Sequence, residues 1–356
     1  MHLDEILRIA NPKQLAAIKH PLAPLMIIAG AGTGKTFTLE NRIIYMIQQY
    51  GVKPDSILTI TYTEKAAKEL KSRLHEKIGQ KVHPMFVGTF HSFCYKLMKD
   101  YQINNADSSS LIDQSEAVHM ILENYDDFMP FMSEEYSINP KISVVESFIP
   151  FFNRLRDELV DIDKVDQSIL KDFYKDDAES LDQLNDLLRI FPIYQNLKKE
   201  NNLIDYNDMI LDTFHALKND TRLLEKVQSK YEHLIIDEFQ DNNYALNEIS
   251  RLISKKNRSI TVVGDDDQVI YSFRGANAFN ISTFEKTYES HPNYEMITLE
   301  TNYRSSQPIL DLANNSIKHN KERKIKSLVS AGKNIEIKPM IFMGEKPEQI
   351  EFIANE

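Results

Sequence analysis

The chain has 356 residues, 42% hydrophobic and 27% charged, a composition typical of a soluble globular protein of two or three domains. No apolar run approaches the ~20 residues that span a bilayer. The start, MHLDEILRIANP, has acidic residues where a signal peptide has basic ones. One cysteine, Cys94, excludes an internal disulfide and a cysteine-rich metal site. We therefore expect a cytoplasmic protein with no membrane partner.

The net charge of −11 is unevenly distributed along the chain. Residues 101–205 hold 22 acidic and 9 basic residues, a net charge of −13, which leaves +2 for the rest. Residues 60–100 hold 8 basic residues against 4 acidic ones. The acidity belongs to one segment, so a phosphate-binding face elsewhere is not excluded.

Strands and helices alternate in the first hundred residues. Apolar runs predict strands at 25–30, 56–63 and 85–90, and helical spacing predicts helices at 36–50 and 64–78. Short connections between such elements predict a parallel sheet covered by helices.

The pattern becomes mostly helical from about residue 93 to 202, and strands return at 233–238 and 259–265. We interpret this as one α/β domain (residues 1–92 and 206–281) interrupted by an acidic helical insertion (residues 93–205). Strands predicted at 296–300 and 334–342 suggest a further domain, 282–356, that is incomplete.

AGAGTGKT, residues 29–36, follows an apolar strand and opens a helix, which is the context of a phosphate-binding loop. Its glycines, Gly30, Gly32 and Gly34, let the backbone turn its N–H groups toward phosphate oxygens. Lys35 would neutralise the β- and γ-phosphates, and Thr36 would place a hydroxyl on Mg²⁺. The alternative is a glycine-rich turn with a stray lysine.

HLIIDEFQD, residues 233–241, places acidic residues directly after an apolar strand. In a phosphate-loop nucleotidase a second strand ends in an acid that holds the Mg²⁺ shell, a role that fits Asp237. Glu238 would accept the proton of the attacking water. Two adjacent acids alone would more often be a solvated turn. Together with GxGKT they indicate hydrolysis of a nucleoside triphosphate.

VVGDDDQVIYSFRGA, residues 262–276, is the third motif. Gln268 follows the tip of an apolar strand, where an amide senses the γ-phosphate or orients water. Tyr271 and Phe273 alternate with Arg274, a combination suited to stacking bases beside a backbone contact. Core packing of the two aromatic rings is the alternative.

Three further motifs are TITYTEKAA (59–67), GTFHSF (88–93) and LETNYRS (299–305). Together, these motifs resemble the ordered motifs of superfamily 1 DNA helicases of the UvrD/Rep/PcrA type. The resemblance implies a RecA-like motor domain (1A), an inserted helical domain (1B) and the start of a second RecA-like domain (2A). It implies ATP as the nucleotide, with Mg²⁺, and single-stranded DNA or its junctions with duplex as the partner.

The resemblance also assigns roles to residues that match the family's motifs. Gln14 in NPKQ would read adenine, Tyr303 would stack on it, and Arg304 would act as an arginine finger. The nucleotide-binding set is Gln14, Ala29, Gly30, Ala31, Gly32, Thr33, Gly34, Lys35, Thr36, Phe37 and Tyr303. The DNA-contacting set is Thr61, Tyr62, Thr89, His91, Tyr206, Tyr271, Phe273 and Arg274. For His91 a structural role, and for Tyr62 and Tyr206 core packing, are the alternatives.

Three features depart from the family pattern. Phe37 stands where arginine is common, which leaves nucleotide specificity open. Phe273 replaces the usual tryptophan. The family's motifs V and VI are absent, so we expect an N-terminal part of a longer helicase, or a naturally shortened one, with weak ATPase activity and no unwinding by itself.

Three alternatives remain open. The first is a nucleotide-gated module that binds DNA or a partner without translocating. The second is a small-molecule nucleotide kinase, which the arginine of NYRS disfavours. The third concerns the acidic insertion, which would serve as a protein-docking surface rather than being merely solvated. Partners in repair, replication or phage defence, and the rest of a second motor domain, are compatible with the sequence.

Overall fold

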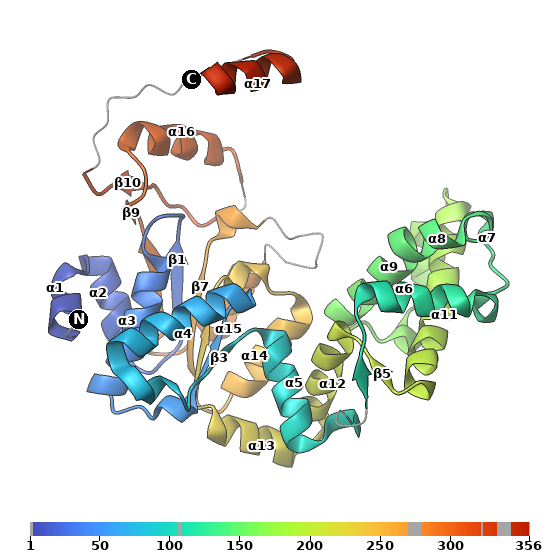
Figure 1. Ribbon diagram of the computed structural model, residues 1–356, viewed down its shortest axis with the longest axis horizontal. Helices are drawn as coiled ribbons and strands as arrows, with labels where there is room; N and C mark the ends of the chain where they lie inside the picture. Colours follow the sequence, from blue (N-terminus) through green and yellow to red (C-terminus); the bar gives the residue numbers. More distant parts are fainter. Residues whose placement is uncertain (1–2, 106–108, 270–278, 322, 333–342, 356) are drawn as a thin grey trace.

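The computed structural model describes residues 3–105, 109–269, 279–321, 323–332 and 343–355 (Figure 1). A sheet of six parallel strands forms its centre, in the order β3-β2-β6-β7-β1-β8. The strands are β1 Leu25–Ala29, β2 Ile57–Ile60, β3 Phe86–Gly88, β6 His233–Ile236, β7 Ser259–Gly264 and β8 Glu295–Leu299. Because all six are parallel, their carboxyl ends meet along one edge, where α/β proteins bind ligands.

Helices cover both faces of this sheet. Leu25 and Ile27 of β1 pack in one core, whereas Met26 and Ile28 pack in the other, as the alternation of a strand requires. The first face is covered by α1 Leu3–Ile9, α2 Pro12–Lys19, α3 Lys35–Gln49 and α4 Glu64–Ile78. The second is covered by α5 Phe90–Tyr101, α12 Tyr206–Asn219, α13 Thr221–Lys230, α14 Tyr244–Ser254 and α15 Asn280–Tyr288. The predicted α/β class with a parallel sheet is confirmed.

The sixth strand corrects one expectation. The strand predicted at 296–300 was assigned to a new domain, but β8 pairs with β1 over five residues, Leu25↔Glu295 to Ala29↔Leu299. Ile297 and Leu299 are buried in the first core. The sheet therefore extends to Leu299, beyond the predicted boundary at residue 281. The strand predicted at 334–342 lies outside the described residues.

The helical insertion forms a third core of its own, at the right of Figure 1. Its elements are α6 Gln114–Glu123, α7 Glu134–Ile138, α8 Pro140–Ser143, α9 Ile149–Asp157, α10 Gln167–Phe173 and α11 Ala178–Glu200. A short parallel pair, β4 Ser110–Leu111 and β5 Leu203–Ile204, joins its two ends. The predicted boundary at residue 93 is wrong, because it divides α5, whose Phe93, Leu97 and Met98 pack against the sheet.

Buried charges fix the insertion to the sheet domain. Arg156 of α9 contacts Asp205 at 2.7 Å and Asp208 at 2.9 Å. Lys198 of α11 contacts Asp205 at 2.8 Å, and the Tyr194 hydroxyl donates to the same carboxylate. Burial alone would raise the pKa of Asp205, but Arg156 and Lys198 hold it far below its usual value. Since breaking such a buried network leaves unpaired charge, the junction is rigidly specified.

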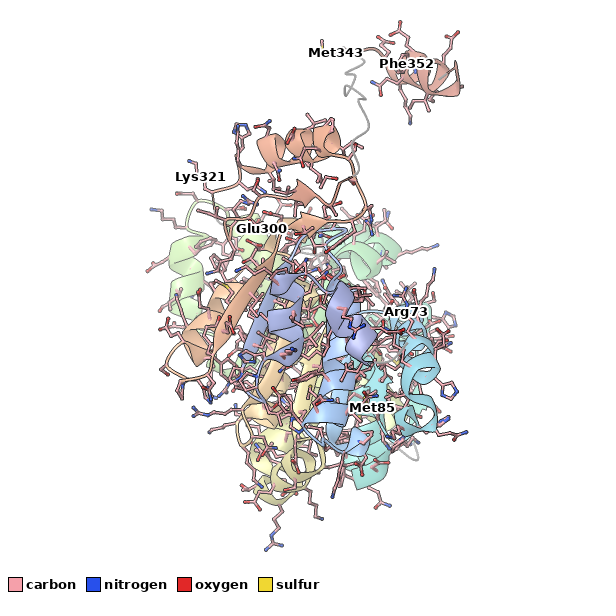
Figure 2. All side chains as sticks on the ribbon, turned by 90° about the vertical axis from the view of Figure 1, so that its left-hand side faces the viewer. Arg73, Met85, Glu300, Lys321, Met343 and Phe352 are labelled. Atoms are coloured by element: carbon pink, nitrogen blue, oxygen red, sulfur yellow. The ribbon has the colours of Figure 1, made fainter. Side chains whose placement is uncertain are left out.

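A small section follows the sheet. It contains a parallel pair, β9 Thr301–Asn302 with β10 Val329–Ser330, and the helices α16 Gln307–Ile317 and α17 Lys346–Asn355. Figure 2 shows Glu300 where the sheet meets this section, with Lys321 and Phe352 farther from the sheet. None of the described helices has both the length and the apolar composition needed to cross a membrane.

Arg42 of α3 is a fully buried cation that ties α2 to the sheet. Its guanidinium donates to the carbonyls of Ala17, His20 and Pro21 at 2.8–3.1 Å and to the Thr261 hydroxyl at 2.9 Å. Burial lowers the pKa of Arg42 to about 10, so it stays charged at neutral pH. Carbonyls at the end of a helix carry partial negative charge, which takes the place of a carboxylate.

We expect Arg42→Met to lower the free energy of unfolding by about 3 kcal/mol, because it leaves buried carbonyls without donors. Urea unfolding followed by circular dichroism measures the change. The exposed Arg222 provides the control, for which Arg222→Met should change stability by less than about 0.5 kcal/mol. Equal effects of the two substitutions would contradict the structural role of Arg42.

Candidate active site

The connection between β1 and α3 has the shape of a phosphate-binding loop. It begins at Ala29, the last residue of β1, and ends at Thr36 in the first turn of α3. Gly32 and Gly34 have φ values of 77° and 85°, in the region that favours glycine. The Thr33 hydroxyl donates to the Gly30 carbonyl at 2.7 Å and braces the turn. The N-terminus of α3 thus lies at this loop, where its partial positive charge favours the binding of phosphate.

Lys35 and Glu238, both predicted to be catalytic, are in direct contact. The Lys35 ammonium lies 2.8 Å and 3.1 Å from the two Glu238 oxygens. Glu238 follows β6 with φ 50° and ψ 46°, a left-handed conformation that costs a non-glycine residue roughly 1 kcal/mol or more. The surrounding structure therefore holds this carboxylate against a local strain, at the carboxyl edge of the sheet.

Two further acids crowd the same edge. Burial and the nearby Glu238 raise the pKa of Asp237 to about 6, although Lys35 opposes the shift, and they raise that of Asp241 to about 6 as well. Asp241 Oδ1 is buried and finds no hydrogen-bond partner among the described residues. A hard cation would stabilise the charged forms, and carboxylate and hydroxyl oxygens are the donors Mg²⁺ prefers. Asp237 and Thr36 offer oxygen donors of this kind, and their role as Mg²⁺ ligands stays a prediction.

Gln268 lies in a short 3₁₀ turn, Asp266–Gln268, after the end of β7. Its side-chain amide donates to the Asp265 carboxylate. The Asp265 backbone N–H in turn donates to Gln240 Oε1 at 3.0 Å, and Gln240 Nε2 donates to Glu238 at 2.9 Å. Gln240 therefore connects the tips of β6 and β7. Gln240 lies in the DEFQD motif, but the sequence predicted no role for it.

A cavity of about 520 Å³ lies above the phosphate-binding loop. Phe37, Tyr303 and Arg304 line it together with Gln14, Lys35 and Thr36. The Tyr303 hydroxyl accepts a hydrogen bond from Asn11 Nδ2 at 2.9 Å. Two aromatic rings and an arginine thus surround a space next to the loop, as a nucleotide base and its phosphates require.

Gln14 is buried and serves first as a structural residue. Its Nε2 donates to the Thr33 carbonyl at 3.0 Å, and its Oε1 accepts from the Asn11 backbone N–H at 3.1 Å. These bonds fix α2 to the phosphate-binding loop. Neither bond uses the second N–H of the same amide.

Asn302 closes the loop from above, a role that the sequence did not assign. Its Nδ2 donates to the Ala31 carbonyl at 2.6 Å, and its Oδ1 accepts from the backbone N–H groups of Arg304 and Ser305. The Tyr303 N–H also donates to the Gly32 carbonyl at 2.8 Å. Asn302 lies inside LETNYRS, the motif that predicted roles for Tyr303 and Arg304 only.

A second cleft, of about 610 Å³, separates the sheet domain from the insertion. Four residues predicted to contact DNA line it: Thr61, Tyr62, Thr89 and His91. Amide side chains are numerous in the lining, which also contains one arginine, Arg154, and three acids, Asp157, Asp237 and Asp241. The cleft offers hydrogen-bonding groups rather than strong positive charge.

The remaining predicted DNA contacts divide into two groups. Tyr206, the first residue of α12, is half-exposed and places its ring edge against His91, with centroids 5.9 Å apart. Packing in the core, the alternative for Tyr206, is therefore wrong. Tyr271, Phe273 and Arg274 lie outside the described residues.

The parallel sheet, the phosphate-binding loop and the Lys35–Glu238 contact define a P-loop nucleotide-binding protein. Comparison with known proteins extends this result, because residues 10–289 match the model of the UvrD/REP helicase N-terminal domain. The chain belongs to the UvrD/REP helicase family.

Curated relatives include proteins named ATP-dependent DNA helicase PcrA. The one from Staphylococcus aureus is 32% identical over 356 residues, and the one from Staphylococcus epidermidis is 33% identical over 331 residues. The matches cover 99% and 92% of this chain but 46% and 42% of the relatives. The chain thus spans about half the length of the relatives it matches.

Gly32→Ala tests the closure of the loop. An added Cβ would lie 2.7 Å from the Arg304 Cβ and 2.8 Å from Asn302 Nδ2. Gly51 is the matched control, because its φ is 68° and a Cβ there would meet nothing within 4 Å. We expect Gly32→Ala to lower the free energy of unfolding by about 2 kcal/mol more than Gly51→Ala, measured in urea. Equal losses would show that the backbone conformation alone requires glycine.

Proposed function

We propose that this chain carries the ATP site of an ATP-dependent helicase that translocates on single-stranded DNA. The observation that carries the proposal is the contact of Lys35 with Glu238, which joins the phosphate-binding loop to a carboxylate at the end of another strand. The family match and the relatives' names support the same reading.

The phosphates of ATP would lie on the loop from Gly30 to Thr36. On binding, Lys35 would exchange its contact with Glu238 for the β- and γ-phosphates, which releases Glu238 to accept a proton from water. Gln268 would orient that water or contact the γ-phosphate, and Arg304 would stabilise the developing charge. Thr36 and Asp237 would hold Mg²⁺, which supplies charge neutralisation when bound.

The base would lie in the 520 Å³ cavity. Tyr303 and Phe37 line it and would hold the adenine ring through their faces, while Gln14 would donate its second N–H to the ring edge. Lys77 lies 6.0 Å from the Phe37 ring centroid and is paired with the buried Glu40 at 2.6 Å, which restrains this wall of the cavity.

DNA would occupy the cleft between the sheet domain and the insertion. Thr61, Thr89 and His91 would contact the strand's backbone, and Tyr62 and Tyr206 offer ring faces for bases. Translocation from 3′ to 5′, unwinding, a cytoplasmic location and repair, replication or defence partners form the finer part of the proposal. They rest on the likeness to helicases of this family.

ATP hydrolysis by the purified chain, with and without single-stranded DNA, tests the proposal. We expect weak turnover that single-stranded DNA stimulates, and we expect Glu238→Gln to abolish it, because the proton acceptor is lost. Glu232→Gln removes an exposed acid just before β6 and should leave turnover unchanged.

ATP binding without turnover in the unsubstituted chain would contradict autonomous hydrolysis and favour a nucleotide-gated binding module. Phosphate transfer to a small acceptor instead of water would favour a kinase. No binding of ATP at all would overturn the proposal.

Asp157 should make DNA binding depend on pH. It lines the cleft, and its Oδ1 accepts from Asn243 at 2.7 Å and from Asn207 at 3.1 Å. Burial raises the pKa of Asp157 to about 7, although Arg156 and Arg154 oppose the shift. The carboxyl is therefore neutral below pH 7 and repels phosphates above it. We expect Asp157→Asn to tighten binding of an oligothymidylate about fivefold at pH 8.

At pH 6 the substitution should change the affinity by less than about twofold, since the native carboxyl is then protonated. Asp237, Asp241 and His91 titrate in the same cleft, so the comparison with Asp157→Asn isolates one group. Asp163→Asn removes an exposed acid of the insertion and is the control. The same gain at both pH values would contradict the prediction. Fluorescence anisotropy provides the measurement.

A further inference from the structure

Residues 323–331 form a strap from the end of β7 to the phosphate-binding loop. At one end Leu328 covers the loop so closely that a Cβ on Gly30 would lie 2.8 Å from its side chain. The Val329 and Ala331 N–H groups donate to the Glu300 and Asn302 carbonyls at 2.9 Å and 2.8 Å. Asn314 of α16 bonds both the N–H and the carbonyl of Leu328. The strap is thus fixed to the loop that would hold the phosphates.

At the other end of the strap, basic side chains contact three aspartates. The Lys326 ammonium lies 2.9 Å from Asp265 and 2.6 Å from both Asp266 and Asp267. The side chain of Lys326 is only 3% exposed. Arg323 adds two bonds to Asp267, at 2.6 Å and 2.7 Å. These aspartates are the one group of three acidic, histidine or cysteine side chains with metal-site geometry among the described residues. The ammonium stands in their midst, so the group needs no metal.

The contact with Asp265 leads to the catalytic residues. Asp265 is buried, and one of its oxygens accepts from the Gln268 amide. Its backbone N–H bonds Gln240, which bonds Glu238. The position of the Asp265 carboxylate therefore sets where the Gln268 amide lies. Without Lys326, three adjacent carboxylates would repel one another, and Asp265 Oδ1 would keep only the Asp267 N–H at 3.2 Å as a partner.

We propose that Lys326 is a positioning residue for recognition of the terminal phosphate: by holding Asp265, it aims Gln268 at the γ-phosphate. The inference rests on the proposed ATP site. It adds that the strap, which belongs to the section after the sheet, takes part in distinguishing a bound triphosphate from a diphosphate.

The pKa values of the cluster agree with this geometry. Burial alone would lower the pKa of Lys326, but its bonds to Asp266 and Asp267 raise it above its usual value. The ammonium is therefore charged at all pH values at which the enzyme would work, so its grip on Asp265 is permanent. Lys326 is therefore a constant anchor for Asp265, and its charge does not change on nucleotide binding.

Nucleotide preference gives the test, because it does not depend on turnover. Isothermal titration with ADP and with the non-hydrolysable analogue AMP-PNP, both with Mg²⁺, yields the ratio of the two dissociation constants. We expect Lys326→Met to reduce the preference for AMP-PNP at least about fivefold, with ADP affinity within about twofold of the unsubstituted chain. Lys324→Met is the matched control, since Lys324 lies on the same strap but its ammonium contacts Glu285.

A double substitution separates positioning from general support of the fold. Gln268→Ala should reduce the preference as Lys326→Met does, and the two together should reduce it no further, because both act through one amide. If Lys326→Met does not fold, Lys326→Met with Asp266→Asn and Asp267→Asn removes the excess negative charge and still leaves Asp265 without its cation. The same loss of preference is expected.

The outcomes distinguish the inference from the proposed function. A folded Lys326→Met chain that keeps the original preference for AMP-PNP over ADP overturns the inference alone. A double substitution that reduces this preference further than either single substitution also overturns the inference alone. An unsubstituted chain that binds both nucleotides equally also overturns it. An unsubstituted chain that binds neither nucleotide overturns the proposed ATP site and the inference with it.

Discussion

The neutralisation of acids at one edge of the sheet is the constraint on which the rest of the site depends. Parallel strands bring their carboxyl ends together, so the acids after β6 and those after β7 share one small region. Each group of three receives a buried or half-buried lysine: Lys35 contacts Glu238, and Lys326 contacts all three aspartates after β7. One lysine comes from the phosphate-binding loop and the other from the strap, which places both segments at the same edge.

Amide side chains connect these charged groups without adding charge. Gln240 joins the tips of β6 and β7, Asn302 joins the phosphate-binding loop to the section beyond the sheet, and Gln14 joins the loop to α2. An amide both donates and accepts, so it bridges two backbone segments in a way that a carboxylate or an ammonium does not. These three amides therefore hold separate segments together at the edge of the sheet through neutral contacts.

The local sequence predicted the helices and strands, but it did not predict which segments lie side by side in the fold. The helix predicted at 64–78 coincides with α4, and the strand-loop-helix order around Lys35 was confirmed. The strand at 295–299 was assigned to the wrong domain, because its apolar pattern carries no information on which strand it pairs with. Lys35 and Glu238 are in direct contact, whereas their motifs predicted roles toward phosphate and water rather than toward each other. Asn302, Gln240 and Lys326 were missed, since their roles arise from contacts between segments distant in sequence.

The way the insertion joins the sheet domain has an evolutionary consequence. Its entering and leaving strands, β4 and β5, lie side by side, with the Ser110 N–H bonded to the Asn202 carbonyl at 2.9 Å. Helices α5 and α12, which flank it in the chain, both pack in the second core of the sheet domain. A segment whose ends are neighbours is exchangeable as a unit, because a short turn in its place would leave the sheet's connectivity unchanged. Apart from Arg156 and Lys198, which neutralise buried acids at the junction, the acidic insertion can therefore diverge in sequence and charge while the nucleotide site stays the same.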